Sequence, residues 1–217
     1  MKKSNIAVTY IGHFGNDLSV VNSARVSMDK THTEFEDVAD TKLIKYLWEH
    51  KHKSPFNHAF LSFRVKAPIF VSRQLVKHKF LPWNEVSRRY VDSEPEFYFP
   101  SMWRKRAENV KQGSSEEEHP DGWDFNCDVN DSIFISVELY LAAIKSGVCP
   151  EQARMILPQN MMTEWIWSGT LGAFIDMLVL RLDHHTQYET RIVAKEIYKH
   201  VADHFPVVCA TIFADEQ

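Results

Sequence analysis

The sequence of 217 residues is poor in cysteine, with only Cys127, Cys149 and Cys209. Three cysteines without a C-x-x-C pair predict neither a disulfide framework nor a zinc ribbon, and they fit a reducing compartment. The sequence also lacks an apolar run near the roughly 20 residues of a membrane helix, and an apolar N-terminal signal segment. We therefore expect a cytoplasmic protein without membrane contact; for a viral protein this would be the host cytoplasm.

An excess of basic charge is missing as well, because 25 Lys and Arg oppose 29 Asp and Glu for a net charge of -4. This balance argues against a general nucleic-acid coat but leaves room for a local basic pocket. What the sequence does contain is apolar material, with 44% hydrophobic residues, six Trp and fourteen Phe. Such a composition predicts a folded chain with a real core, and the length suits one domain over residues 1–217.

Hydrophobic periodicity predicts several helices and few strands. Alternation predicts strands at residues 5–10 and 59–67, and in the second strand Leu61, Phe63 and Val65 share one face. Helical spacing is found at residues 34–50, between Pro68 and Pro82, at 131–146, after Pro150, at 170–182 and at 186–205. Helices and strands without regular alternation favour the α+β class.

Residues 104–131 differ from the rest of the chain, since they are polar, mixed in charge and rich in turn formers. We interpret them as a surface excursion of a single domain, not as a linker between two domains. A solvated loop is the favoured interpretation over a functional lid.

The most distinctive segment is RQLVKHKFLPWNEVSRRY, residues 73–90, which carries five cationic side chains. On the predicted helix, Arg73 and Lys77 lie four residues apart, as do Gln74 and His78, so each pair shares a face. Like charges at this spacing repel, and an anionic ligand would relieve the repulsion. Arg and Lys together suit a phosphate.

From charge alone, a basic surface for nucleic acid is an equal alternative. Two features favour a pocket for a nucleotide. Asn84, Glu85 and Ser87 offer donors and acceptors suited to a heterocycle, and the apolar stretch Phe80–Trp83 interrupts the charges as a pocket wall would.

At this segment the sequence resembles the flavin-dependent thymidylate synthases. That family carries Arg-His-Arg, seven residues and then Ser, and this chain has Lys77-His78-Lys79, seven residues and then Ser87. Further segments similar to the family, in the family's order, are SARVSMD, HKSPFNHAFLSFRVKAPIFVSRQ, ARMILP and LRLDHHTQYE. Four motifs in order are far more specific than one, and they cover most of the chain outside residues 104–131.

The resemblance implies a curved, mainly antiparallel sheet with packed helices, and a homotetramer with active sites between subunits. It also implies conversion of dUMP to dTMP without a cysteine nucleophile. The carbon would come from methylenetetrahydrofolate, and FAD reduced by NADPH would supply the hydride. The small-molecule partners would then be dUMP, the folate and NADPH, with no nucleic acid.

The resemblance further implies the residues of the site, taken position by position. The catalytic residues are Arg181, Ser87 and His52. The dUMP-binding residues are Gln74, Lys77, Ser87, Arg88, Arg89, Arg154 and Arg181. The FAD-binding residues are Ser54, Lys77, His78, Lys79, Glu85, Thr170, Gly172, Asp176 and His185.

The role implied for Arg181 makes physical sense, because methylation needs the 5-carbon of uracil as a nucleophile. A cation at a carbonyl edge of the ring favours the electron-rich form, as an oxyanion site does. In the family the counterpart of Ser87 binds substrate and is not a nucleophile. No His is locally paired with Ser87 as a base in this sequence, which agrees.

This chain departs from the family at several positions. Lys77 and Lys79 replace two arginines, which keeps the charge but loses the planar fork. Arg88 replaces a usually smaller residue. Where the family often has Asn and Arg, residues 170–176 offer Thr170, Gly172 and Asp176, so we expect altered flavin contacts there.

The eleven His residues raise a metal-dependent nucleotide hydrolase as an alternative. His185 and Glu189 are four apart, a spacing that can place two ligands on one face. The sequence has no H-E-x-x-H motif and no compact set of three ligands, so we predict no metal. A nucleic-acid-binding module is the other alternative, and it lacks a motif such as helix-turn-helix.

Overall fold

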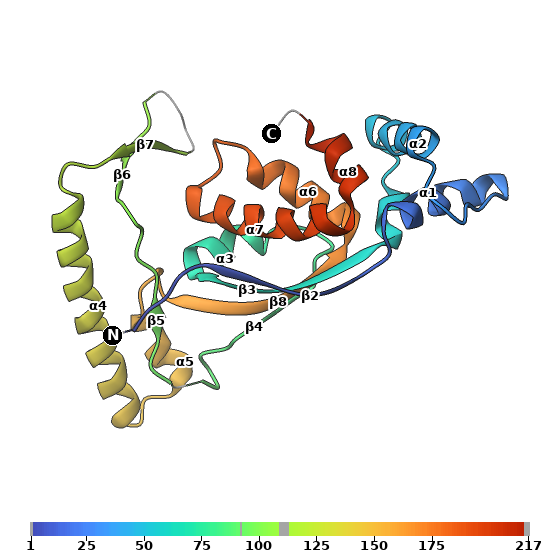
Figure 1. The fold of residues 1–217 in the computed structure, drawn as a ribbon. Helices are drawn as coiled ribbons and strands as arrows, with labels where there is room; N and C mark the ends of the chain where they lie inside the picture. The colour runs from blue at the N-terminus through green and yellow to red at the C-terminus, as the bar shows by residue number, and fades with distance from the viewer. Residues whose placement is uncertain (1, 92, 109–112, 215–217) are drawn as a thin grey trace.

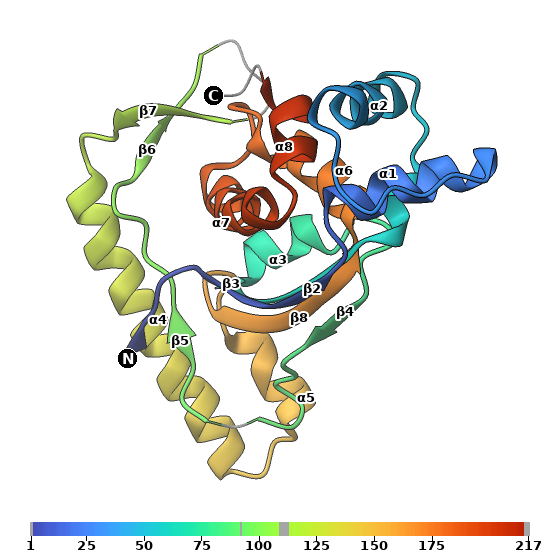
Figure 2. The ribbon, with the colours of Figure 1, turned by 45° about the vertical axis from the view of Figure 1, so that its right-hand side comes forward.

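A computed structural model describes residues 2–91, 93–108 and 113–214. Its centre is a four-stranded antiparallel sheet in the order β2-β3-β8-β4, which curves beneath a layer of helices (Figures 1 and 2). The strands are β2 (Ala7–Phe14), β3 (Phe60–Pro68), β8 (Met162–Thr170) and β4 (Trp83–Glu85). The predicted α+β class and the curved, mainly antiparallel sheet are confirmed.

Strand β3 follows the predicted alternation closely. The side chains of Leu61, Phe63, Val65 and Ala67 are completely buried on the face that meets the helices. The opposite face carries Lys66, whose register partner on β8 is Glu164. The first strand, predicted at residues 5–10, begins and ends later than expected. It is β2, which extends from Ala7 to Phe14.

The helical layer lies on one face of the sheet and contains the main core. Helix α6 buries Leu171, Phe174, Ile175 and Leu178, as its apolar stripe predicts. The helices of this layer and their neighbours are α1 (Asp17–Arg25), α2 (Asp37–Glu49), α3 (Ile69–Leu75), α6 (Leu171–Leu182), α7 (Tyr188–His204) and α8 (Pro206–Ile212). Short 3-10 turns are Val26–Met28, Ser54–His58 and Arg154–Ile156. No described helix is long and apolar enough to cross a membrane.

A second, smaller core lies at the side of the molecule under the long helix α4 (Gly122–Lys145). It joins Ile133, Val137 and Tyr140 of that helix to Phe97 and Ala153. The surrounding elements are β1 (Lys2–Lys3), β5 (Glu96–Phe97), β6 (Arg104–Arg106), β7 (Ser114–Glu118) and α5 (Pro150–Ala153).

The expectation of a solvated loop at residues 104–131 is wrong for the described part of that stretch. Strands β6 and β7 form an antiparallel hairpin, and α4 begins at Gly122, nine residues before the predicted start. Residues 109–112 lie outside the described residues. The helix predicted at residues 186–205 is found as α7 (Tyr188–His204), but it is not the last one, because Pro206 opens a further helix, α8.

Helix α3 is shorter than predicted, since it ends at Leu75 and not at Pro82. Lys77 and His78 therefore lie in a turn, and the expected shared helix faces with Arg73 and Gln74 do not exist. The chain leaves the helix because Leu81 is buried against β8, and Phe80 takes a positive φ of 61° in that turn. Gly169 of β8 allows this contact, because a Cβ there would lie 2.8 Å from the carbonyl oxygen of Phe80.

Candidate active site

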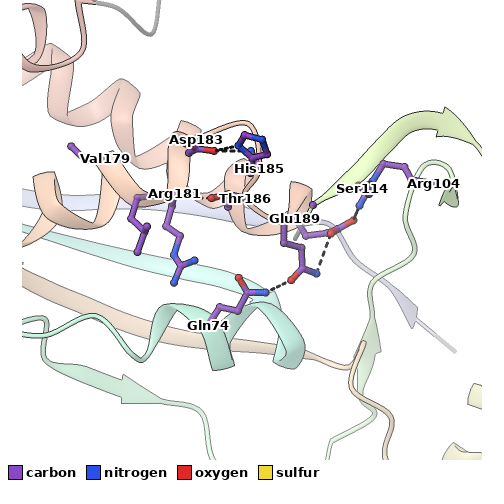
Figure 3. A pocket seen from close by; sticks show the side chains of 12 residues that line it. Gln74, Arg104, Ser114, Val179, Arg181, Asp183, His185, Thr186 and Glu189 are labelled. Atoms are coloured by element: carbon purple, nitrogen blue, oxygen red, sulfur yellow. Dashed lines mark hydrogen bonds and ion pairs between the residues drawn. The ribbon is translucent and has the colours of Figure 1, made fainter. Parts of the chain in front are cut away.

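A cavity of about 840 Å³ lies between α3, the end of α6, the start of α7 and the β6–β7 hairpin; we call it the helix-side cavity (Figure 3). Gln74 extends from α3 and Arg181 from the last turn of α6, so that their polar ends face the same space. The cavity is lined by Gln74, Arg104, Gly113, Ser114, Val179, Leu180, Arg181, Asp183, His185, Thr186, Gln187 and Glu189. Three predicted site residues, Gln74, Arg181 and His185, thus meet here.

Arg181 is held by His78, which reaches it from the turn after α3. The guanidinium Nε donates to Nε2 of His78 over 3.0 Å. Burial, and then the charge of Arg181, lower the pKa of His78 to about 4 from an ordinary 6.5. The imidazole is therefore neutral at pH 7, and because Nε2 accepts, its proton resides on Nδ1. The cationic guanidinium of Arg181 thus lies beside the neutral ring of His78, whose Nδ1–H is a donor group.

Several cavity residues escaped sequence reasoning. Glu189 was considered only as a metal ligand, yet it is 4% exposed and accepts from Nη2 of Arg104 over 2.6 Å. Gln187 bonds to both Glu189 and Gln74. The sequence does contain one signal for this role. Glu189 is an acid in the first turn of a helix, directly after Tyr188.

A second cavity, of about 790 Å³, lies on the opposite face of the sheet, where Lys66 of β3 and Glu164 of β8 are neighbours in the strand register; we call it the groove. It gathers Arg73, Glu85, Arg88 and Arg154, three of them predicted site residues. Its remaining lining residues are Lys66, Ile69, Val86, Val91, Ser93, Glu94, Glu96, Glu151, Met155, Leu157, Gln159, Met161, Met162, Thr163 and Glu164.

Local bonds fix the polar groups at the groove. Glu85 accepts from the hydroxyl of Thr163 over 2.6 Å and from Nε1 of Trp83 over 2.9 Å. The guanidinium of Arg88 donates to the carbonyl oxygen of Ser93. These bonds hold the loop after β4 at the rim of the groove.

Arg154, which lines the groove, and Arg89 beside it are exposed and make weaker local contacts. Nε of Arg154 donates to the carbonyl oxygen of Glu151 over 3.3 Å. Nε of Arg89 donates to Oγ of Ser87 over 3.2 Å, so the predicted binding residues Ser87 and Arg89 do lie together. Both guanidinium groups keep most of their donors for a ligand.

The predicted convergence of all cationic site residues is not found within one chain. Arg181 and Arg154 line different cavities, and the helix-side cavity and the groove share no lining residue. Even the neighbours Arg73 and Gln74 on α3 line different cavities. The predicted site residues of one chain are therefore divided between two cavities on opposite faces of its sheet.

A third set of predicted residues lies around the start of α6. Thr170 caps this helix by accepting from the N–H of Ala173 over 3.2 Å, and its hydroxyl donates to Asn57. Gly172 leaves room for Asn57, whose Oδ1 would lie 2.5 Å from a Cβ at that position. Asp176 pairs with Lys53 over 2.8 Å. These groups have structural partners, so their contacts with FAD remain predictions.

The remaining predicted residues are exposed. His52 packs edge-on against Tyr46, and Ser54 begins a 3-10 turn. The ammonium groups of Lys77 and Lys79 have no ion pair or hydrogen bond with any other described residue. Two cations without protein partners remain available for an anionic ligand.

The expectation of no compact ligand set needs correction, because Asp183, His184 and His185 hold their donor atoms within 4.8 Å of one another. All three residues are exposed, and the two imidazole rings are tilted by 41° with centroids 3.7 Å apart. Asp183 already accepts from the N–H and ring of His185, so these bonds explain the cluster.

Comparison with known proteins gives a consistent result. The profile of a family described as "Thymidylate synthase complementing protein" matches residues 9–207. A flavin-dependent thymidylate synthase of Kosmotoga olearia is 38% identical over 197 residues, which cover 89% of this chain and 84% of the relative. One from Thermus thermophilus is 37% identical over 213 residues, which cover 94% of this chain and 74% of the relative.

Among solved structures, a UMP/dUMP methylase of Streptomyces cacaoi bound with 5-Br dUMP has the same fold as this chain. The TM-score is 0.88 at 27% sequence identity, and the match covers 99% of this chain and 97% of the methylase. The match therefore covers the segments that line both cavities, and not only the central sheet.

Proposed function

Since the chain belongs to the flavin-dependent thymidylate synthases, we propose that it methylates dUMP at a site completed by two or more copies of itself. The observation that carries this proposal is the separation of its two half-sites. The helix-side cavity holds Gln74 and Arg181, while the groove holds Arg88 and Arg154. A homotetramer would let the groove of one subunit close over the helix-side cavity of another.

The residues of the half-sites suit a phosphorylated pyrimidine. Arg88 and Arg154, with Ser87 and Arg89 beside them, offer the donors that a phosphate requires. Arg181 is half-buried, where a cation acts more strongly on charge that develops on the uracil ring. Lys77 is a further donor for the nucleotide.

The residues near Arg181 also fit FAD, the cofactor of this family. The neutral His78 can donate from Nδ1 to an acceptor on the flavin ring, and Lys77 and Lys79 can neutralise a diphosphate. Bound FAD supplies the hydride that completes the methyl group, after reduction by NADPH, while methylenetetrahydrofolate supplies the carbon. We propose Ser54, Glu85, Thr170, Gly172, Asp176 and His185 as further FAD contacts.

In this scheme Arg181 and Ser87 act on dUMP without a cysteine nucleophile. Arg181 stabilises negative charge on the ring as its 5-carbon attacks, and Ser87 orients the nucleotide. His52 would contribute from the exposed segment before β3. For the cellular location we propose the cytoplasm, on the ground that Cys127, Cys149 and Cys209 are all unpaired thiols.

Turnover is the first test. Purified protein with FAD, methylenetetrahydrofolate and NADPH should form dTMP from dUMP, measured by product chromatography. UMP serves as a parallel substrate, because the methylase of Streptomyces cacaoi is described as acting on UMP and dUMP. Binding of both nucleotides without any methylated product contradicts the proposed reaction.

Subunit mixing tests whether copies share a site. Arg181→Ala should abolish most activity, and Arg154→Ala should lower it by a smaller but measurable factor, when each variant is assayed separately. If one site takes Arg154 and Arg181 from different subunits, mixed tetramers contain some sites with both residues intact. Mixing the two variants should then restore a measurable part of the activity, after a brief treatment that exchanges subunits.

A mixture of Arg181→Ala with Arg181→Lys is the matched control, because no arrangement of subunits restores that arginine. Lack of recovery in the first mixture, with hybrid tetramers demonstrated by mass spectrometry, contradicts a shared site.

A further inference from the structure

A series of hydrogen bonds runs from the β6–β7 hairpin to α3 along the wall of the helix-side cavity (Figure 3). Nη2 of Arg104 donates to Oε1 of Glu189 over 2.6 Å, and Nε2 of Gln187 donates to Oε2 of the same carboxylate over 3.3 Å. Nε2 of Gln74 then donates to Oε1 of Gln187. The hydroxyl of Thr190 donates to Oε1 of Gln74 over 3.2 Å and completes the series.

The carboxylate of Glu189 fixes the direction of every bond in the series. An ionised carboxylate only accepts, so Gln187 must turn its NH₂ group toward Glu189 and its oxygen toward Gln74. Gln74 must in turn offer its NH₂ group to that oxygen. Its own oxygen therefore lies toward Thr190, whose hydroxyl can rotate to donate.

This direction decides what Gln74 presents to the cavity. One hydrogen of its Nε2 and one lone pair of its Oε1 remain after the bonds to Gln187 and Thr190. If the amide were inverted, a donor would stand where the acceptor now is. A buried donor or acceptor left without a matching partner loses more free energy than a site from which both partners of the bond have been removed.

We propose that Glu189 and Gln187 are positioning residues which set the amide orientation of Gln74 toward dUMP, and that Arg104 of the hairpin holds Glu189 in this role. The inference rests on the proposed function, because it takes Gln74 as a substrate contact.

Burial explains the need for Arg104. Glu189 is 4% exposed, and an unpaired carboxylate at that depth would be strongly destabilising. The Arg104 side chain is 14% exposed and lies with its guanidinium carbon 4.5 Å from the ring centre of Tyr188. Its Nε also donates to Ser114 on the second strand of the hairpin, over 2.8 Å. The hairpin thus supplies the one cation that pairs with Glu189 among the described residues.

The test begins with Glu189→Gln, which keeps the shape of the side chain but alters the direction of the hydrogen bonds in the series. Arg104 can only donate, so it would hold the oxygen of the new amide and turn the NH₂ group toward Gln187. The amides of Gln187 and Gln74 would then both invert. We expect the KM for dUMP to rise about tenfold or more, with the absorbance spectrum of bound flavin unchanged.

The double variant Gln187→Glu, Glu189→Gln is the decisive comparison. The amide at position 189 accepts from Arg104 and donates to the new carboxylate at 187, which can only accept from Gln74. Gln74 regains its original direction, so the KM for dUMP should return to within about threefold of the wild-type value. If only the ion pair of Arg104 with Glu189 mattered, the double variant would stay as impaired as Glu189→Gln.

Glu117→Gln is the matched control, because Glu117 pairs with Lys105 on the same hairpin, outside the cavity. Its KM for dUMP should not change. If Glu189→Gln does not fold, Gln187→Met takes its place, since it removes the acceptor for Gln74 and should also raise the KM for dUMP. An unchanged KM in the folded variant overturns the inference.

Gln74→Leu separates this inference from the proposed function. If it leaves the KM for dUMP unchanged, the assignment of Gln74 to the substrate fails. If it raises the KM while Glu189→Gln does not, only the role of Glu189 and Gln187 fails. A wild-type protein that forms no dTMP contradicts the proposed function itself.

Discussion

The helix-side cavity and the groove hold the two halves of the proposed site, and they are built in different ways. In the cavity, Arg181, Gln74 and Glu189 are half-buried or buried, and each bonds to another side chain. In the groove, Arg88 and Arg154 donate to backbone carbonyl oxygens, and Lys66 pairs with the carboxylate of Glu96. The cavity is therefore preorganised, whereas the groove keeps its guanidinium groups open to solvent or to a ligand.

The cavity and the groove also differ in how their charged side chains are arranged. Lys66, Arg73, Arg88 and Arg154 of the groove are opposed by the carboxylates Glu85, Glu94, Glu96, Glu151 and Glu164. Solvent and salt screen such exposed charges, so each contact there is weak by itself. We infer that a substitution in the cavity will have a larger effect than an equivalent substitution in the groove, and four predictions test this difference.

Arg181→Ala should have the largest effect. Removal of a preorganised cation beside the reacting ring should lower kcat for dUMP by about 100- to 1,000-fold. Steady-state kinetics with saturating methylenetetrahydrofolate and NADPH measure the loss. A decrease below about tenfold would show that Arg181 has no special role in the chemical step.

Acid should destabilise the cavity through His78. The unfolded chain binds this proton near pH 6.5, but the folded protein binds it only near pH 4. Stability from this group is therefore complete above pH 6.5 and declines as the pH falls toward 4. Because the ring is half-buried, solvent limits the total to about 1–3 kcal/mol.

Urea denaturation at several pH values measures this decline. His78→Gln, whose amide oxygen can still accept from Arg181, is the control and should lose less stability in the same window. Equal pH dependence in the two proteins would assign the decline to other groups.

Lys77→Ala should have an intermediate effect, because Lys77 is exposed and its ammonium bonds to no described residue. Loss of one ammonium from a phosphate site should weaken binding of FAD or dUMP about tenfold. Titrations followed by flavin fluorescence and by calorimetry report the two affinities. The prediction is wrong if both stay unchanged, and Lys145→Ala at the end of α4 is the control.

Arg88→Ala in the groove should have the smallest effect, a rise of about threefold in the KM for dUMP. Its guanidinium already donates to the carbonyl oxygen of Ser93, so part of its role is to hold the loop. The effect should shrink further as salt is added. A loss as large as that of Arg181→Ala would remove the distinction between cavity and groove.

Local patterns in the sequence determined much of the fold. The alternation of β3 and the apolar stripe of α6 each describe one element facing one core, so they predicted both elements closely. Resemblance to the family predicted the curved sheet, which is confirmed, and it is the source of the proposed site residues Gln74, Arg181 and Arg154. These predictions depend on residue type and order, which the sequence states directly.

Tertiary structure decided where the elements end and which residues meet. Helix α3 stops at Leu75 because Leu81 is buried against β8, a contact between segments far apart in the chain. Arg104 and Glu189, separated by 85 positions, pair only because the hairpin folds over the start of α7. Arg73 and Gln74 are adjacent on α3 but line different cavities, because different distant segments surround each of them. Such contacts depend on burial between distant segments, and no local pattern encodes them.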